Sequence, residues 1–344
     1  MIMKNFKKSL ALLLVALLLV PVLSACSSYD EDYAIYELWV AGVKVTTRNA
    51  SDILGDGTVS YDGDGKTGTL TLNGANIANS SNPDADAIIV SLIDNLTINL
   101  VGENQVGMGK KAPVNGIAAL DLMIQGGGSL SVGARASCIK ANKFIVDSGK
   151  IDTYIKTAED EIASFIGVGL WAQEELTING GDIQVHYQAD YSPISYGLYC
   201  VKDVTVNGGK IFVDPEDSQM LAISLISSET LTINGGEHSL YGFDDAMNAR
   251  YFSMAGGTVN ADAIDIFSDG VCRLVKKAEF TGGTMTLNCL MKMAPDSITL
   301  YSEDGPIFTG MTILGGNSPE ELAVKDAASY EYKDICIRIE KEGN

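Results

Sequence analysis

The chain has 344 residues, with 24 basic and 44 acidic side chains and a formal net charge of −20. This length allows one or two domains with a sizeable core, and the charge excludes nucleic acid as a partner, because phosphate backbones are bound by clustered Lys and Arg. Only two histidines, His186 and His238, are present, so sites that need several imidazole ligands are poorly supplied.

Residues 1–25 are predicted to be an export signal. Three lysines precede an apolar run over residues 10–20, which is about half the length of a membrane-spanning helix. The following Leu-Ser-Ala-Cys ends at Cys26 and resembles the lipobox of bacterial lipoproteins, whose cysteine carries a diacylglyceryl group. We therefore expect an extracytoplasmic chain that is lipid-anchored to the bacterial cell membrane through Cys26, with an acidic tether over residues 26–35. An ordinary secretory signal with an incidental cysteine is the alternative.

Residues 36–78 alternate apolar and polar side chains around turn signals, which predicts an N-terminal module of several β-strands. Such a module would cap the first coil of the structure that follows and cover its strand edge. Within it, Asp62-Gly-Asp64-Gly resembles the start of a calcium loop. The further acidic ligands of such a loop are missing, so a hairpin turn is the prediction.

A short phrase recurs eight times between residues 95 and 283. Each copy has an apolar residue followed by an Asn or a residue in its place, and seven of the eight then continue into a glycine turn. The copies follow one another at intervals of 21 to 32 residues. A period in this range indicates a solenoid, and the alternating stretches on both sides of the glycine predict strand, tight turn and strand. The apolar positions are Ile98, Ile124, Val146, Ile178, Val206, Ile233, Met254 and Phe280.

The predicted fold class is all-β: a right-handed parallel β-helix solenoid over residues 79–316, with the N-terminal β cap and a C-terminal cap over residues 317–344 that contains a closing strand. A third short apolar segment precedes each phrase, so we expect three strands per turn. Stacked coils would satisfy one another's backbone groups, and right-handed winding follows from the general preference of parallel crossovers. The turn asparagines are expected to form a structural hydrogen-bonded ladder. They are Asn99, Asn179, Asn207 and Asn234.

His238 falls at the inward position that Ile183 and Ile211 occupy in other repeats. We expect a neutral core histidine with a backbone partner instead of a ligand, because no second imidazole is near in the pattern. The five cysteines after Cys26 are an odd number without paired spacing, so they are expected to be core residues and not a disulfide framework.

Three stretches carry a family resemblance: GLWAQEELTINGGDIQV (169–185), GLYCVKDVTVNGGKIFV (197–213) and DDAMNARYFSMAGGTVN (244–260). They resemble the repeats of a bacterial surface family of carbohydrate-binding β-helix proteins that are similar in fold to pectate lyases. The resemblance implies calcium-dependent, non-catalytic binding of a polysaccharide such as cellulose or polygalacturonate. Because glycine-turn repeats also occur in enzymes and adhesins, a pectate-type polysaccharide lyase and a protein-binding surface adhesin remain open.

Aromatic faces beside polar groups are typical of glycan sites. Trp171 and Tyr199 are expected to face outward on adjacent coils, and Tyr191 and Tyr196 lie in or beside an insertion that could line the same groove. An equal alternative is that the insertion or the N-terminal module covers this strip. These outward-facing positions form one predicted column, which is found by counting back five residues from each phrase. Its members are Ile139, Trp171, Tyr199, Ile226, Met247 and Arg273.

Calcium needs several oxygen ligands, and Asp244 with Asp245 matches the acidic pair that opens the family's repeats. Asp269, about one coil later, is a candidate third ligand, and a solvated acidic turn is the alternative. An acidic protein repels polyuronates unless calcium bridges the two, so a neutral glycan or a calcium-bridged uronate is the expected ligand. A lyase would need a base beside that calcium, for which Arg250 is placed. We expect a monomer.

Overall fold

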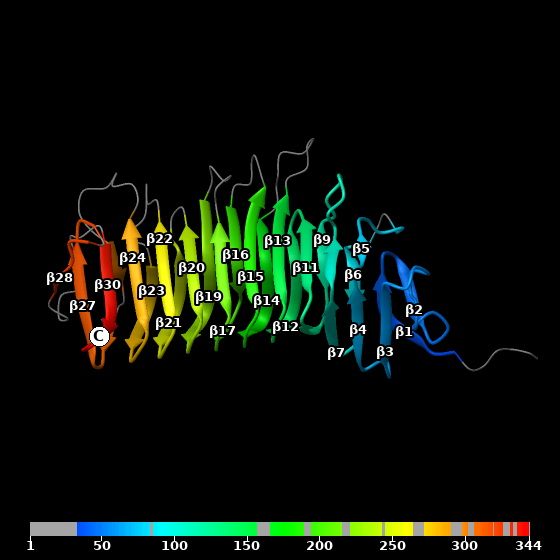
Figure 1. Ribbon diagram of the computed structural model, residues 1–344, viewed down its shortest axis with the longest axis horizontal. Helices are drawn as coiled ribbons and strands as arrows, with labels where there is room; N and C mark the ends of the chain where they lie inside the picture. Colours follow the sequence, from blue (N-terminus) through cyan, green and yellow to red (C-terminus); the bar gives the residue numbers. More distant parts are fainter. Residues whose placement is uncertain are drawn as a thin grey trace, which may run out of the picture.

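A computed structural model covers the chain. The residues that the structure describes are 33–82, 85–156, 166–188, 194–214, 221–242, 245–263, 272–289, 298–301, 306–318, 320–325, 331–332 and 336–343. These residues form strands and turns and contain no helix, so none of them belongs to a helix able to span a membrane. The strands lie side by side in an elongated stack, along which the chain advances from its N-terminal to its C-terminal end (Figure 1).

The described strands form two sheets, of 18 and 12 strands, which we name sheet A and sheet B. Sheet A consists of β1 (Ile35–Val40), β2 (Val43–Thr46), β3 (Val59–Gly63), β4 (Thr67–Asn73), β6 (Ala87–Ser91), β7 (Asn95–Val101), β9 (Asn115–Ala118), β10 (Asp121–Gly126), β12 (Ser137–Val146), β14 (Gly167–Ile178), β16 (Ile194–Cys200), β17 (Asp203–Val206), β19 (Leu221–Ile233), β21 (Met247–Met254), β23 (Cys272–Phe280), β25 (Ile298–Tyr301), β26 (Pro306–Phe308) and β29 (Glu331–Tyr332). Sheet B consists of β5 (Asn76–Ile77), β8 (Glu103–Val106), β11 (Ser129–Ala134), β13 (Lys150–Lys156), β15 (Asp182–Gln188), β18 (Lys210–Asp214), β20 (Glu237–Gly242), β22 (Thr258–Ala263), β24 (Thr284–Cys289), β27 (Met311–Gly316), β28 (Ala323–Val324) and β30 (Cys336–Lys341).

Most neighbouring strands are parallel, and each pairs with the strand one repeat later in the sequence. In sheet B, for example, β13 pairs with β15, β15 with β18 and β18 with β20. The eight apolar positions of the repeated phrase lie in register across sheet A, and all eight side chains are at most 1% exposed. The repeat predicted from the sequence is therefore the repeat of the structure, and its apolar position forms the core.

A tight turn joins each of these sheet A strands to the next sheet B strand. Gly209 shows why glycine is needed there: its φ is +81°, and a Cβ at this position would lie 2.7 Å from the carbonyl oxygen of Gly181 in the neighbouring turn. Both the left-handed backbone and the close stacking of turns exclude a larger residue. The turns can therefore stack at the strand spacing.

The prediction of three separate strands per turn is only partly matched. In β12, β14, β19, β21 and β23, the segment before the phrase and the phrase itself form one continuous strand. A shift in register marks the place where the two segments meet, as between Ala141 and Lys143 of β12. One extra residue at such a place bends a strand without ending it.

Antiparallel strands close both ends of the stack. At the N-terminal end, β1 pairs antiparallel with β2 and β6, and β3 forms a hairpin with β4. The carboxylate of Asp64 accepts hydrogen bonds from the backbone N–H groups of Lys66 and Thr67 (both 2.8 Å), so the expected hairpin turn is confirmed. At the C-terminal end, β30 pairs antiparallel with β24 and β27.

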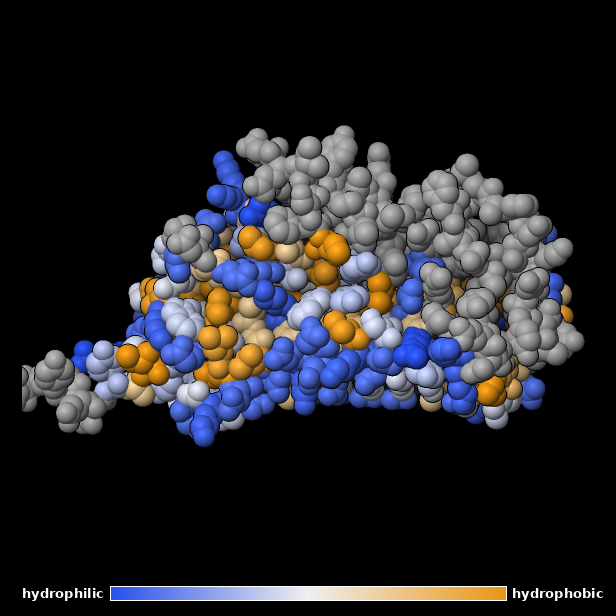
Figure 2. All heavy atoms as spheres, turned by 180° about the vertical axis from the view of Figure 1, so that it is seen from behind, coloured by the Kyte–Doolittle hydropathy of each residue, from blue (hydrophilic) through white to orange (hydrophobic). Residues whose placement is uncertain are grey.

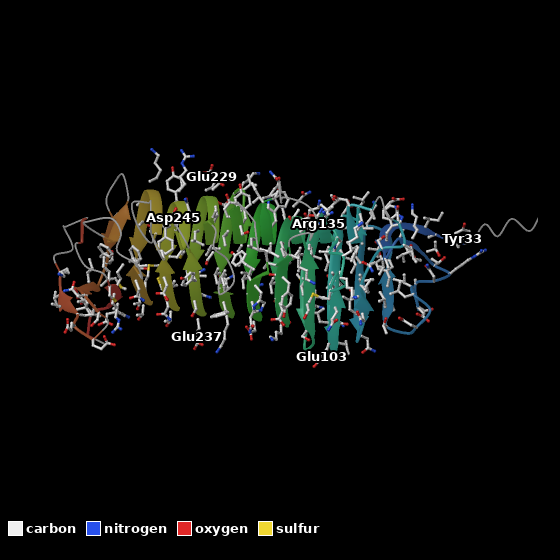
Figure 3. The ribbon with its side chains drawn as sticks, turned by 90° about the horizontal axis from the view of Figure 1, so that it is seen from above. Tyr33, Glu103, Arg135, Glu229, Glu237 and Asp245 are labelled. Carbon is white, nitrogen blue, oxygen red and sulfur yellow. The ribbon has the colours of Figure 1, made fainter. Side chains whose placement is uncertain are left out.

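The two sheets face opposite sides of the molecule. Figure 3 shows Glu229, which belongs to β19 of sheet A, on one long side, and Glu237 of β20 and Glu103 of β8, both in sheet B, on the other. From behind, a hydrophilic band follows the lower edge, and hydrophobic residues gather above it toward the N-terminal half (Figure 2). Each sheet can thus present its own surface to solvent.

Candidate functional site

One outward-facing row of side chains crosses sheet A from β1 to β21, and we name it the aromatic column. Its members are partly exposed, apart from the buried Ile226, whereas the residues on either side of them in their strands are mostly buried. Both tryptophans of the chain are in it. In register order the aromatic column is Trp39, Val90, Ala118, Lys140, Trp171, Tyr199, Ile226 and Asn248.

The aromatic column differs from the predicted one at two positions. Lys140 and Asn248 take the places expected for Ile139 and Met247, which are both completely buried. β12 and β21 have one residue fewer at the bend than β14, β19 and β23, so counting back a fixed number of residues from the phrase goes one residue too far in these two strands. The correction replaces two apolar side chains by an ammonium and an amide.

Three of the four predicted aromatic residues lie together. Trp171 and Tyr199 are in register on β14 and β16, about 4.8 Å apart as neighbouring strands are. The ring of Tyr196 stacks on that of Tyr199, with 5.3 Å between ring centroids and 23° between planes. Burial, and then the neighbouring Tyr199, raises the pKa of the Tyr196 hydroxyl. Tyr191 lies outside the described residues.

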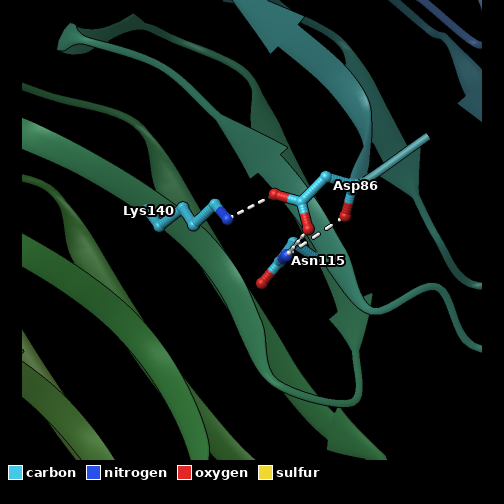
Figure 4. A network of polar contacts seen from close by, with 3 residues as sticks. All are labelled: Asp86, Asn115 and Lys140. Atoms are coloured by element: carbon cyan, nitrogen blue, oxygen red, sulfur yellow. Dashed lines mark hydrogen bonds and ion pairs between the residues drawn. The ribbon is translucent and has the colours of Figure 1, made fainter.

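A polar network adjoins these rings (Figure 4). The ammonium of Lys140, which is in register with Trp171, forms an ion pair with the carboxylate of Asp86. The buried amide of Asn115 donates hydrogen bonds to the carboxylate (3.0 Å) and the carbonyl oxygen (3.1 Å) of Asp86. Lys140 and Asp86 are 54 residues apart in the sequence and have no shared motif, which is why the sequence pattern did not reveal them.

This arrangement suits a sugar better than it suits catalysis. Aromatic rings cover the apolar faces of sugar rings, and the ammonium, carboxylate and amide nearby can bond to hydroxyl groups. At the far end of the aromatic column, the ammonium of Lys44 lies 4.6 Å from the centre of the Trp39 ring. Trp171 and Tyr199, with Tyr196, are thus the aromatic surface that remains next to the polar network.

Of the three predicted calcium ligands, the structure describes Asp245 alone. Its side chain is buried and accepts a hydrogen bond from the Asn248 amide at 3.4 Å. Asp244 and Asp269 lie outside the described residues, as does the predicted lipidation site Cys26. Among the described residues, no three His, Cys, Asp or Glu side chains are grouped closely enough to hold a metal ion. Arg250, the candidate base, is exposed and pairs with Glu229 at 3.5 Å.

Several residues whose side chains could bind a ligand or react have structural roles instead. The Asn207 amide donates to Asn179 and the Asn234 amide to Asn207, both at 2.9 Å, so the predicted ladder is confirmed for these three residues. Asn99 is instead opposite Gln125. His238 is buried and bonds the Gly235 carbonyl, as expected. The side chains of four of the predicted core cysteines are described, and all four are buried: Cys138, Cys200, Cys272 and Cys336.

Comparison with known proteins adds one finding. A family model described as carbohydrate-binding domain-containing protein matches residues 115–270. No curated protein and no solved structure matches the chain significantly. The matched segment contains Lys140, Trp171, Tyr196 and Tyr199, so the part of the chain that carries the aromatic surface is similar to a carbohydrate-binding family.

Proposed function

We propose that the protein binds polysaccharide without cleaving it and that the aromatic column is the binding surface. One observation carries the proposal: Trp171 and Tyr199 are in register on adjacent strands, beside the Lys140 network and within the segment that matches the carbohydrate-binding family model. Flat rings spaced along a rigid sheet can contact a sugar chain that runs across the strands. The binding surface needs no conformational change to form.

We also infer that the two sheets are faces of a right-handed parallel β-helix solenoid. Supporting this, the chain passes alternately from sheet A to sheet B, and the parallel pairings recur at the period of the repeated phrase. A solenoid displays its columns as straight rows, which suits a linear polymer. The proposed protein is a monomer that Cys26 anchors, through lipid, to the outside of the bacterial cell membrane.

The ligand is proposed to be a neutral glycan such as cellulose, or a polygalacturonate bridged by calcium. The net charge of −20 disfavours direct binding of an anionic polymer. Asp244, Asp245 and Asp269 are the proposed calcium ligands, and bound calcium would supply the positive charge that a uronate needs. Calcium dependence therefore distinguishes the two ligand classes.

The test is a pull-down of the full-length chain, solubilised in mild detergent, on cellulose and on cross-linked polygalacturonate, with calcium or with EDTA. We expect retention of the wild type and at least about tenfold weaker retention of Trp171→Ala/Tyr199→Ala, because two stacking contacts of about 1 kcal/mol each are removed. Tyr251→Ala is the matched control, since Tyr251 is an exposed tyrosine outside the aromatic column.

Three results would contradict the proposal. Equal retention of the double variant and the control would exclude the aromatic column, and no retention on either polysaccharide would favour a protein-binding adhesin. Release of unsaturated uronates, followed by ultraviolet absorbance of the supernatant, would make the protein a lyase. Loss of retention in EDTA is expected only for polygalacturonate.

A further inference from the structure

A groove crosses the outer face of sheet B, on the side of the molecule opposite to the aromatic column. Its floor is one in-register row of side chains on β13, β15, β18, β20 and β22. A depression of about 450 Å³ covers the last four of them. The floor residues are Asp152, Gln184, Phe212, Ser239 and Asn260.

Two aromatic rings lie beside the first two positions of the floor row, next to the depression. Tyr154 and His186, the next outward-facing residues after Asp152 and Gln184, are stacked with 4.8 Å between ring centroids and 17° between planes. Both are partly exposed, and Phe212 on the floor is 41% exposed. Phe212 thus leaves part of an apolar ring open to solvent, and its neighbours in the floor row, Gln184 and Ser239, are polar.

Asp152 supplies an independent observation. Its side chain is on the outward-facing row, yet the residue is only 8% exposed. Its Oδ2 pairs with the Lys150 ammonium at 3.2 Å, whereas its buried Oδ1 has no hydrogen-bond partner within the described part of the chain. A buried carboxylate oxygen without a donor is unfavourable, and a ligand hydroxyl that reached it would relieve this cost.

A row of charged residues borders the floor on the side away from Tyr154 and His186, and it indicates which class of ligand fits. Lys150, Asp182, Lys210 and Glu237 alternate in sign in a single row, and Lys210 pairs with Glu237 at 2.8 Å. With Asp152, the groove carries two positive and three negative groups. Such a balance gives no attraction for an anionic polymer and leaves hydroxyl, amide and aromatic groups to make the contacts.

We propose that this groove is a second carbohydrate-binding site and that it takes a neutral polysaccharide chain lying across the strands of sheet B. The Tyr154 and His186 rings contact the apolar face of a sugar, and the partly accessible Asp152 carboxylate accepts a hydrogen bond from a sugar hydroxyl. The floor extends across five strands, about 19 Å at the usual strand spacing, so it spans several sugar units. With the aromatic column on sheet A, the protein would hold two polysaccharide chains at once.

The experiment measures how many cellohexaose molecules bind per full-length chain in detergent, by isothermal titration calorimetry. We expect two for the wild type and for the Tyr251→Ala control, and one for either Tyr154→Ala/His186→Ala or Trp171→Ala/Tyr199→Ala. The quadruple variant should bind none. Asp152→Asn, which preserves the side-chain volume, removes the carboxylate charge and its ion pair with Lys150, and it should weaken the groove site severalfold.

The outcomes separate the two binding sites. A first contrary outcome is that the wild type binds one molecule only. If that binding is abolished by Trp171→Ala/Tyr199→Ala and is unaffected by Tyr154→Ala/His186→Ala and by Asp152→Asn, the groove proposal is overturned and the proposed function stays intact. The converse pattern would overturn the aromatic column and support the groove. Absence of any cellohexaose binding would refute a neutral-glycan groove. If Tyr154→Ala/His186→Ala does not fold, Asp152→Asn alone decides, and unchanged affinity of both sites would refute the groove.

Discussion

His238 is a buried histidine in a row that is otherwise aliphatic, between Ile211 and Val259 on the neighbouring strands. The residue is 2% exposed, and its ring bonds the Gly235 carbonyl through Nε2 at 2.9 Å. A carbonyl only accepts, so Nε2 carries the proton and donates. Nδ1 has no partner among the described residues, which leaves no acceptor there for a second proton. Burial accordingly lowers the pKa of His238.

This pKa shift makes stability depend on pH. Between the folded-state pKa and about 6.5, the ordinary value of an unfolded histidine, the unfolded chain binds more protons than the folded one. The stabilisation is therefore complete above about pH 6.5 and is lost as the pH falls toward the folded-state pKa. When the pH is lowered from 7.5 to 5.5, we expect the free energy of unfolding in urea to fall more for the wild type than for His238→Ile. Isoleucine is chosen because it is the residue found at the equivalent positions 183 and 211. Parallel pH profiles would show that His238 does not titrate with folding.

The glycine turn is the element in which neighbouring repeats are linked by side chains as well as by backbone. Asn207 takes part in two ladder hydrogen bonds, as a donor to Asn179 and an acceptor from Asn234. Asn234 makes one of these bonds. The bonds run across stacked turns, so each one connects residues 27 or 28 positions apart in the chain.

The number of bonds sets the order of stability among variants. At about 0.5–1.5 kcal/mol for each hydrogen bond, Asn207→Ala should lower the free energy of unfolding by about 1–2 kcal/mol and Asn234→Ala by about half as much. Chemical denaturation of both variants measures the difference. Thr205→Ala, two residues before Asn207 and partly exposed on the same strand end, should change the stability least. If the two asparagine variants lose the same free energy of unfolding, the hydrogen bonds between turns contribute no stability beyond what each asparagine contributes within its own turn.

Elements with a repeated local signal could be predicted from the sequence, and elements set by distant contacts could not. The phrase identified Ile98 and its seven counterparts as a core row, because apolar alternation recurs in each copy and a glycine turn in seven of the eight. The same counting selected Ile139 instead of Lys140, since the pattern has no signal for how many residues a strand has at its bend. Asp86 was missed because only the folded register brings it beside Lys140. Asp152 was missed because nothing in the sequence shows that its side chain is buried or that His186 lies opposite Tyr154.

At the scale of the whole molecule, parallel stacking leaves a row of unpaired backbone groups at each end, and such edges pair readily with other chains. In sheet B the C-terminal edge is closed by β30, which lies antiparallel between β24 and β27. Its residues Ile337 and Ile339 are 1% exposed, so β30 also covers the end of the core. The strand thus protects the last repeat from both water and other chains.

Removal of residues 336–344 should expose the edges of β24 and β27 together with the apolar surface under Ile337 and Ile339. We expect the truncated chain to associate end to end, and its mass in light scattering after size-exclusion chromatography should rise with concentration while the wild type remains a monomer. A second variant, Ile337→Lys, keeps the backbone pairing but places a charge under the cap, so it should lower the unfolding midpoint without promoting association to the same degree. If the truncated chain stays monomeric at all concentrations, backbone pairing by β30 is not what prevents association. Repulsion between chains of net charge −20 is then the remaining physical cause. Raising the salt concentration would screen this repulsion and should then allow the truncated chain to associate.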